Sequence, residues 1–323
     1  MCTAVTYKTN DFYFGRNLDY ETEFGESVVI MPRKYNVSMS NSDMLGGDYA
    51  VCGMAHVEKG FPLFYDAMNE KGLCAAGLNF VGNAFYNKPS DKKYNVAQYE
   101  FIPWLLARCA NLEEAKKSIN KMNMTDTPFS ENLPSAMLHW LISDKTGSVT
   151  LEITKSGMFL YDNPVGVLTN NPPFPMQLFS LNNYMSLSSS NPENRFGGVE
   201  LSIYSRGMGA LGLPGDLSSQ SRFIRACFAK LNSKSEPEEA ASVSQFFHIL
   251  GATEQQRGCC EVGKGKYEIT MYSSCCNADK GIYYYKTYEN SAITAVNMKN
   301  EKLDGDRLIC YPLRNKQDVF FEN

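Results

Sequence analysis

The sequence predicts an α+β fold in which antiparallel sheets are covered by helices. Strand-like and helix-like segments occur in separate runs, in the order strands, helices, strands, helices, strands. Neighbouring strands are separated by short turns rich in Gly, Asn, Asp and Ser, which favour hairpins over crossover connections. Because no repeat, low-complexity tract or linker interrupts the pattern, we expect one domain over residues 1–323.

The first run of strands starts at the second residue of the chain. A turn at 9–11 and a stop at Pro32 bound the first strands, and residues 36–50 are polar enough to predict an exposed loop. Short apolar runs bounded by Gly, Asn and Asp predict buried strands further on. The strands of this run are expected at residues 2–7, 12–14, 28–31, 61–66 and 72–80.

The helices alternate with two further runs of strands. After a polar loop at 81–95, helical spacing predicts a helix with a kink or restart at Pro103, and Asn111 with Glu114 forms a capping box for the next one. The helices are expected at residues 96–109, 111–121, 217–232 and 238–252. The later strands are expected at residues 138–143, 148–154, 158–162, 267–276, 282–288 and 292–297.

Composition narrows the function classes. A hydrophobic fraction of 43% is ample for a sizeable core, and a net charge of -4 without a basic cluster argues against a nucleic-acid partner. No secretory signal and no run of eighteen apolar residues occurs, which predicts a cytoplasmic protein without membrane insertion. The ten cysteines are therefore expected to be reduced thiols.

The N-terminal hairpin carries the strongest candidate for chemistry. If Met1 is removed, Cys2 combines a thiol nucleophile and an α-amine base in one residue. Arg16 and Asp19 follow where the second strand returns toward the first, so a guanidinium could favour the thiolate and a carboxylate could hold the amine. The simpler interpretation, a core cysteine beside a surface ion pair, does not use the special position of residue 2.

Two other patterns are weaker. The glycines at 207, 209 and 212 match a dinucleotide motif, but Pro214 follows at once and no acidic residue lies about twenty positions later, so we predict a loop that passes close to other backbone. The cysteine pairs at 259–260 and 275–276 lack metal-ligand spacing, and no metal or cofactor is expected. A Cys-His hydrolase stays an alternative, although nothing singles out one of the three histidines, His56, His139 and His248.

Several apolar residues lie in otherwise polar loops near the proposed nucleophile. Each alone is more often a core residue, but together they could line a cleft for a large apolar acyl group. They are Leu18, Tyr20, Phe61, Phe129 and Leu133.

The chain closely resembles the bile salt hydrolases of the choloylglycine hydrolase family, which are N-terminal-nucleophile enzymes. The resemblance runs from the N-terminus to the last strands and includes a Cys2-Thr3 start and the run from Phe14 to Asp19. The matching segments are residues 1–3, 14–19, 69–73, 77–80, 138–140, 166–170, 213–216, 221–223 and 281–285. The resemblance implies a four-layer αββα sandwich and assembly as a homotetramer.

The resemblance also implies a role for each site residue. Cys2 would be the nucleophile, Arg16 would contact its thiol and Asp19 would orient its amine. Asn79 and Asn170 would donate to the oxyanion, and Arg222 would complete the polar network. The implied reaction is hydrolysis of glycine- or taurine-conjugated bile salts without a cofactor.

Two alternatives stay open. The related penicillin V acylases share the chemistry, but position 79 is commonly tyrosine in that group, and Asn79 matches the bile salt form. A non-catalytic protein that binds conjugated steroids would use the same cleft, although it gives no reason for Arg16 and Asp19.

Overall fold

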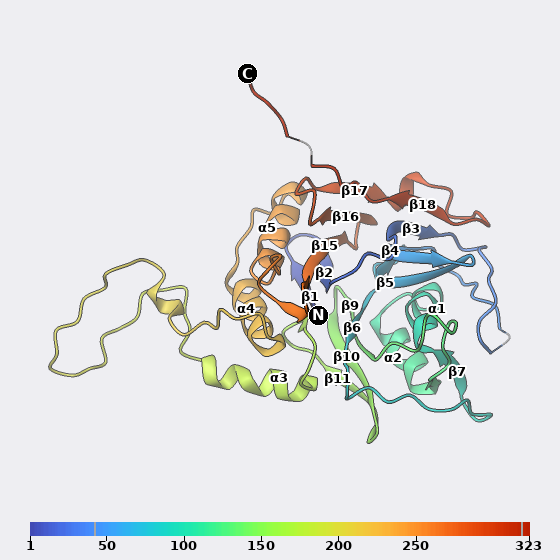
Figure 1. Cartoon of the computed structure of the whole chain (residues 1–323), viewed down its shortest axis with the longest axis horizontal. Helices are drawn as coiled ribbons and strands as arrows, with labels where there is room; N and C mark the ends of the chain where they lie inside the picture. The colour runs from blue at the N-terminus through green and yellow to red at the C-terminus, as the bar shows by residue number, and fades with distance from the viewer. Residues whose placement is uncertain (42, 318) are drawn as a thin grey trace.

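The computed structural model describes residues 1–41, 43–317 and 319–323. Its two large sheets lie face to face and are covered by helices on their outer sides, so that the chain forms four layers (Figure 1). Every strand pair in these two sheets is antiparallel. The α+β sandwich predicted from the sequence is therefore confirmed.

The six-stranded sheet carries the N-terminus in its interior. Its strands, in spatial order, are β12 (Val167–Leu168), β1 (Cys2–Lys8), β2 (Phe12–Tyr20), β15 (Ile269–Asn277), β16 (Ile282–Thr287) and β17 (Thr294–Asn297). The hairpin of β1 and β2 thus lies between segments that are far away in the sequence. Because β1 pairs on both sides, the N-terminal residue is held at a fixed point of the sheet.

The eight-stranded sheet contains two strands that were not predicted, β4 and β18. In spatial order its strands are β11 (Gly157–Asp162), β10 (Gly147–Thr154), β9 (Leu138–Asp144), β6 (Cys74–Asn79), β5 (Phe61–Asn69), β4 (Val51–Glu58), β3 (Ser27–Met31) and β18 (Ile309–Pro312). In β4 the alternation is interrupted by a register shift between Met54 and Ala55, and Gly53 lies where a Cβ would be 2.1 Å from Asp66 O. These two irregularities hide the strand pattern.

The helices cover the outer faces of the sheets. Helices α4 (Ser219–Asn232) and α5 (Glu239–Gly251) pack on β1, β2 and β15, whereas α1 (Phe101–Arg108) and α2 (Leu112–Lys121) pack on the eight-stranded sheet. The helix α3 (Phe174–Ser180) was not predicted. Shorter elements are the 3₁₀ turns Gln98–Glu100, Leu181–Tyr184, Met208–Ala210 and Met298–Asn300, and the small sheets of β7 (Tyr94–Ala97) with β8 (Met122–Thr125) and β13 (Glu261–Gly263) with β14 (Lys266–Tyr267).

Three local predictions need correction. The helix expected at 96–109 begins only at Phe101, because residues 94–97 pair in parallel with β8. Pro103 causes no kink: it is the third helical residue, where a backbone N–H has no intrahelical partner to lose. The loop at 36–50 is not simply exposed, since Met39 and Leu45 are buried in the core beneath α1.

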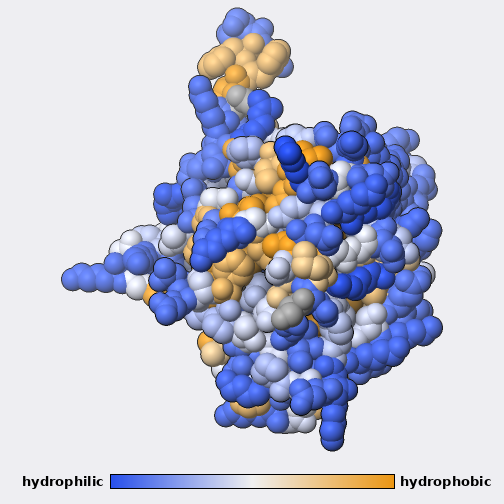
Figure 2. Space-filling view, turned by 90° about the vertical axis from the view of Figure 1, so that its right-hand side faces the viewer, coloured by the Kyte–Doolittle hydropathy of each residue, from blue (hydrophilic) through white to orange (hydrophobic). Residues whose placement is uncertain are grey.

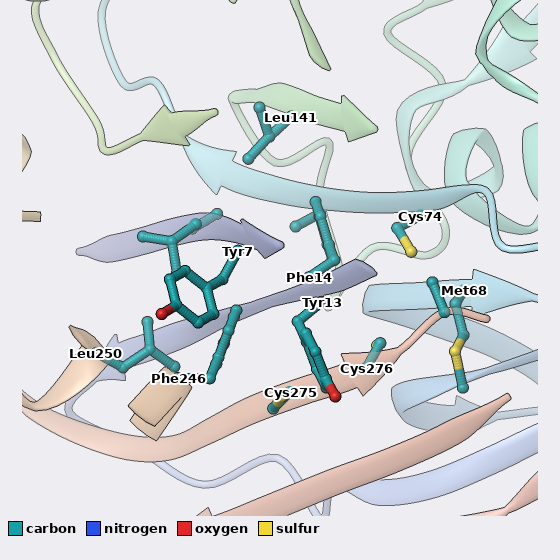
Figure 3. Close-up of a cluster of buried hydrophobic side chains, with 14 of the residues drawn as sticks. Tyr7, Tyr13, Phe14, Met68, Cys74, Leu141, Phe246, Leu250, Cys275 and Cys276 are labelled. Carbon is teal, nitrogen blue, oxygen red and sulfur yellow. The ribbon is translucent and has the colours of Figure 1, made fainter. Parts of the chain in front are cut away.

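Both faces of the six-stranded sheet are packed against apolar side chains. Figure 3 shows Phe14 directed toward Leu141 of the second sheet, while Tyr7 lies beside Phe246 and Leu250 of α5. A second cluster fills the space between the eight-stranded sheet and α1 and α2. Because the six-stranded sheet is covered on both sides, polar groups on either face are removed from water and need partners.

The outer surface carries hydrophilic side chains and, among them, separate apolar areas. On the face in Figure 2, hydrophobic residues gather in a band across the middle, and the C-terminal end protrudes at the top. Val319, Phe320 and Phe321 are exposed there. Within the described part of the chain, no helix has the length and apolar character needed to span a membrane.

Candidate active site

The alternation of β2 divides the predicted site residues between two faces of the sheet. Cys2 pairs with Leu18, and Arg16 lies on the same face, where its Nη1 donates to Gly77 O of the second sheet at 2.5 Å. Asn17 points the other way and donates to Leu250 O of α5. Asp19 shares the face of Asn17 because strand side chains repeat every two residues. The thiol therefore faces the second sheet and the carboxylate faces the helices.

The thiol of Cys2 is in direct contact with a buried guanidinium. Arg16 Nη2 donates a hydrogen bond to Cys2 Sγ, and Nη1 is held by Gly77 O and by Tyr65 O at 3.1 Å. Burial acts to lower the Arg16 pKa. The nearby Cys2 thiol, Tyr272 hydroxyl and Asp66 carboxyl have a larger effect in the opposite direction, so the Arg16 pKa is raised. A permanent positive charge at this point favours the thiolate, which is the reactive form.

The backbone nitrogen of Cys2 has its own set of partners. It donates to Asn170 Oδ1 at 2.8 Å, and the same oxygen accepts from Arg222 Nη2 at 2.8 Å. Asn170 Nδ2 in turn donates to Asn79 O at 2.9 Å. These bonds fix the nitrogen that would become the α-amine after removal of Met1.

Arg222 of α4 connects the parts of the site on the helix side. It is 0% exposed, and its Nη1 donates to Cys2 O and to Thr3 Oγ1, both at 2.6 Å. The same nitrogen lies 3.8 Å from Asp19 Oδ2. Burial lowers the Arg222 pKa, and the charges of Asp19 and Cys2 oppose that shift. The buried carboxylate is thus balanced by a buried cation.

Met1 is clamped beside this network. Its α-amine donates to Asp19 O at 2.7 Å and forms an ion pair with the buried Glu268, while its carbonyl accepts from Asp19 N at 2.9 Å. Burial lowers the pKa of the Met1 α-amine. While Met1 is attached, the nitrogen of Cys2 belongs to a peptide bond and cannot act as a base, so removal of Met1 stays a prediction on which the amine's role depends.

A mainly apolar cavity of about 250 Å³ adjoins the thiol. Cys2, Arg16, Asp19 and Asn79 lie at its polar end, whereas Asn170 and Arg222 stand behind Cys2. Of the five apolar residues predicted to line it, the wall contains Leu18, Tyr20, Phe129 and Leu133.

Phe61 does not form part of that wall, and its predicted place is corrected. It is 3% exposed and packs behind Phe129, with ring centroids 6.0 Å apart, and edge-on against Tyr99. Its ring points into the core because it lies on β5 rather than in a loop. Tyr99 takes its place on the cavity wall.

The weaker sequence patterns add no partner to Cys2, although His56 lines the cavity. Met208–Ala210 forms one 3₁₀ turn, and a Cβ at Gly209 would lie 1.8 Å from Ser190 O, so the glycine motif is a loop in close contact with other backbone, as predicted. His139 is satisfied by Glu152 and by Thr169 O. Over residues 1–41, 43–317 and 319–323 no hydrogen bond joins a histidine to Cys2, and no group of three His, Cys, Asp or Glu side chains could hold a metal. The ten cysteines are free.

Sequence reasoning missed two buried residues that contact Asp19. Thr270 Oγ1 donates to Asp19 Oδ1 at 2.6 Å, and Gln255 Nε2 donates to Asp19 Oδ2 at 3.1 Å. Neither lies in a segment that carries the family resemblance, and polar residues are common at strand starts and helix ends. Only the pairing of β15 with β2 brings them to the site.

Comparison with known proteins decides the family. A model of the linear amide C-N hydrolases of the choloylglycine hydrolase family matches residues 2–311. The chain belongs to this family. A bile salt hydrolase/transferase of Lactiplantibacillus plantarum is 55% identical over 324 residues, which cover 100% of both chains.

Solved structures support the same assignment. A variant of conjugated bile acid hydrolase from Clostridium perfringens matches with a TM-score of 0.93 at 38% identity, covering 100% of both chains. Penicillin V acylase from Agrobacterium tumefaciens matches with a TM-score of 0.75 at 20% identity, covering 95% of this chain and 90% of that one. The second likeness concerns the fold alone.

Proposed function

We propose that this family member hydrolyses the amide bond of glycine- or taurine-conjugated bile salts. One observation carries the proposal: the Cys2 thiol, paired with Arg16, lies at the polar end of a cavity whose remaining wall is mainly apolar. A conjugated bile salt has the matching form, because its amide joins a small polar group to a large apolar ring system. The apolar part would be buried in the cavity and the amide would lie at the thiol.

The reaction follows from the groups around Cys2. Its sulfur attacks the acyl carbon, and its proton passes to the free α-amine of the processed chain. The carbonyl oxygen becomes an oxyanion, for which Asn79 on the cavity wall is the proposed donor, with Asn170 beside it. The C–N bond then breaks, and the α-ammonium gives its proton to the departing amine.

Water completes the cycle. The α-amine takes a proton from a water molecule, whose oxygen attacks the thioester carbon. The C–S bond breaks and returns the proton to the sulfur, so that free bile acid leaves and the starting state is restored. Asp19 and Asn170 would keep the amine directed at the sulfur throughout.

The purified protein tests the proposal directly. Glycocholate, taurocholate and penicillin V are supplied separately, and free bile acid or released amine is measured before and after treatment with iodoacetamide. We expect turnover of the bile salts that alkylation abolishes. Hydrolysis that survives alkylation of Cys2 contradicts the cysteine mechanism. Faster turnover of penicillin V would favour an acylase, and binding without hydrolysis would favour a steroid-binding protein.

A variant at Asn170 tests the amide cluster. Loss of one oxyanion donor typically lowers kcat about 100-fold to 1,000-fold, so Asn170→Ala is expected to be nearly inactive with its fold intact. Asn182→Ala is the matched control, because Asn182 is exposed and its side chain donates, among the described residues, to Phe179 O alone. Near-parental turnover by Asn170→Ala contradicts the assigned role.

We also propose a homotetramer in the cytoplasm. The segment between α3 and α4 runs far out from the layers (Figure 1) and exposes large apolar side chains, including Phe196 and Tyr204, at 72% and 78%. Such residues are suited to burial against another copy of the chain. Light scattering after size-exclusion chromatography should give four times the 36.2 kDa chain mass, and cell fractionation tests the location.

A further inference from the structure

We propose that Thr270 and Gln255 are positioning residues that hold the Asp19 carboxylate in a fixed orientation beside the nucleophile. The inference rests on the proposed function of Cys2 and deepens it. Asp19 is 0% exposed and both its carboxylate oxygens are engaged, Oδ1 by the Thr270 hydroxyl and Oδ2 by the Gln255 amide. Both partners are themselves buried.

The hydrogen bonds form a connected network that fixes the orientation of Asp19. The backbone N–H of Gln255 donates to Thr270 Oγ1 at 2.8 Å, and an N–H can only donate. The same hydroxyl donates to Asp19 Oδ1 at 2.6 Å. Because the Gln255 Nε2 group also donates, both oxygens of Asp19 act as acceptors. The carboxylate is thus held at both of its oxygens.

A β-bulge brings Thr270 to the correct face of the sheet. Thr270 pairs with Asp19 and Tyr272 pairs with Leu18, so that Met271 is the additional residue on β15. Without the bulge, Thr270 and Tyr272 would share one face. With it, Tyr272 donates to Asp66 of the second sheet, whereas Thr270 points to Asp19 on the helix side. The bulge thus allows β15 to donate a hydrogen bond to each of the buried carboxylates of Asp19 and Asp66.

Other charged groups lie near Asp19, on both faces of the sheet. Arg222 Nη1 approaches from α4 to 3.8 Å, and Arg16 and the Cys2 thiol lie nearby on β2 and β1. The α-amine of Met1 and its partner Glu268 complete the set. None of these groups replaces the two neutral donors, because Arg222 lies beyond hydrogen-bond distance of the carboxylate. The clamp therefore has a separate effect on the orientation of Asp19.

The test compares four variants with the parent enzyme. Loss of a hydrogen bond to a buried charged group should lower kcat about 10-fold to 100-fold in Thr270→Val and in Gln255→Leu, with KM for glycocholate little changed. The split between kcat and KM is the readout, because neither Thr270 nor Gln255 lines the cavity. Thr287→Val and Gln256→Leu are controls, since the buried Thr287 hydroxyl has no partner among the described residues and Gln256 is exposed.

Conservative replacement separates positioning from packing. Thr270→Ser keeps the hydroxyl and should recover most of the kcat. The clamp is refuted if Thr270→Ser is as slow as Thr270→Val, or if Thr270→Val and Gln255→Leu turn over at half the parental rate or better. If Thr270→Val does not fold, Gln255→Leu alone decides.

A measurement without substrate keeps this inference distinct from the proposed function. The rate of Cys2 alkylation by iodoacetamide is followed against pH, with peptide mass identifying the modified cysteine. An alkylation rate changed about threefold or more in Thr270→Val, and restored in Thr270→Ser, supports the clamp. Coincident profiles overturn it. If the parent hydrolyses no bile salt, the proposed function fails while alkylation still tests the clamp.

Discussion

Replacing Arg222 with methionine removes the guanidinium that connects Cys2, Thr3 and Asn170 by hydrogen bonds. The side chain donates to Cys2 O, Thr3 Oγ1 and Asn170 Oδ1 within 2.8 Å and to Leu217 O at 3.0 Å. Methionine would fill most of the volume but would donate nothing. The substitution therefore tests the electrostatic role of Arg222 more than its packing.

The expected cost follows from the groups left without a partner. Removal of one member of a buried ion pair typically costs about 3 to 5 kcal/mol. Asp19 keeps its bonds from Thr270 and Gln255, and Asn170 Oδ1 keeps the bond from Cys2 N. We therefore expect the lower end of the range, a loss of about 3 kcal/mol in the free energy of unfolding, together with at least about 100-fold lower kcat.

Urea unfolding followed by circular dichroism measures the stability of this variant, and glycocholate turnover measures its activity. Arg225→Met is a matched control on the same helix. Arg225 donates to Gly215 O at 2.7 Å, and its Nε and Nη2 are buried without a partner in the described structure, so its loss should cost less than about 1 kcal/mol. The reasoning is refuted if Arg222→Met unfolds within about 0.5 kcal/mol of the parent.

Three further predictions concern other parts of the chain. Burial lowers the pKa of Lys230 to about 8. Between about pH 8 and 10.5 the unfolded chain therefore binds more protons than the folded chain. The free-energy cost of burying Lys230 falls as pH rises through that window. From pH 7.5 to 10.5, urea titrations should show the free energy of unfolding of the parent rising by up to about 3 kcal/mol relative to that of Lys230→Met. A constant difference between the two proteins contradicts this. The Ser218 side chain accepts a hydrogen bond from Ser221 N at the start of α4. Ser218→Ala should lower the free energy of unfolding by about 1 kcal/mol without changing KM. An unchanged midpoint of urea unfolding would rule out the cap. Chain translated in vitro without methionine aminopeptidase should keep Met1 and be inactive; full activity with Met1 detected by intact mass would exclude the α-amine as base.

The hairpin at the N-terminus shows what the sequence by itself determined. The turn at 9–11 predicted that Arg16 and Asp19 return toward Cys2, and the pairing of β1 with β2 confirms it. Their placement on opposite faces was not predicted, because the expected second strand ended at Phe14, whereas β2 continues to Tyr20. The same local rules predicted the cap at Asn111 and the α+β class. Asn79, Asn170 and Arg222 followed only from resemblance to a family, because nothing in their local sequence joins them to Cys2.

Tertiary structure alone decided which distant segments meet at the thiol. Strand β15 pairs with β2 across about 250 residues of chain, and the bulge at Met271 directs Thr270 to Asp19; neither feature has a signal in the sequence. Phe61 likewise became a buried support because β5 places its ring behind Phe129. Local patterns set the direction of a side chain relative to its own strand. The order of the strands decides which residues surround that side chain, and this order depends on burying the apolar faces of the whole chain together.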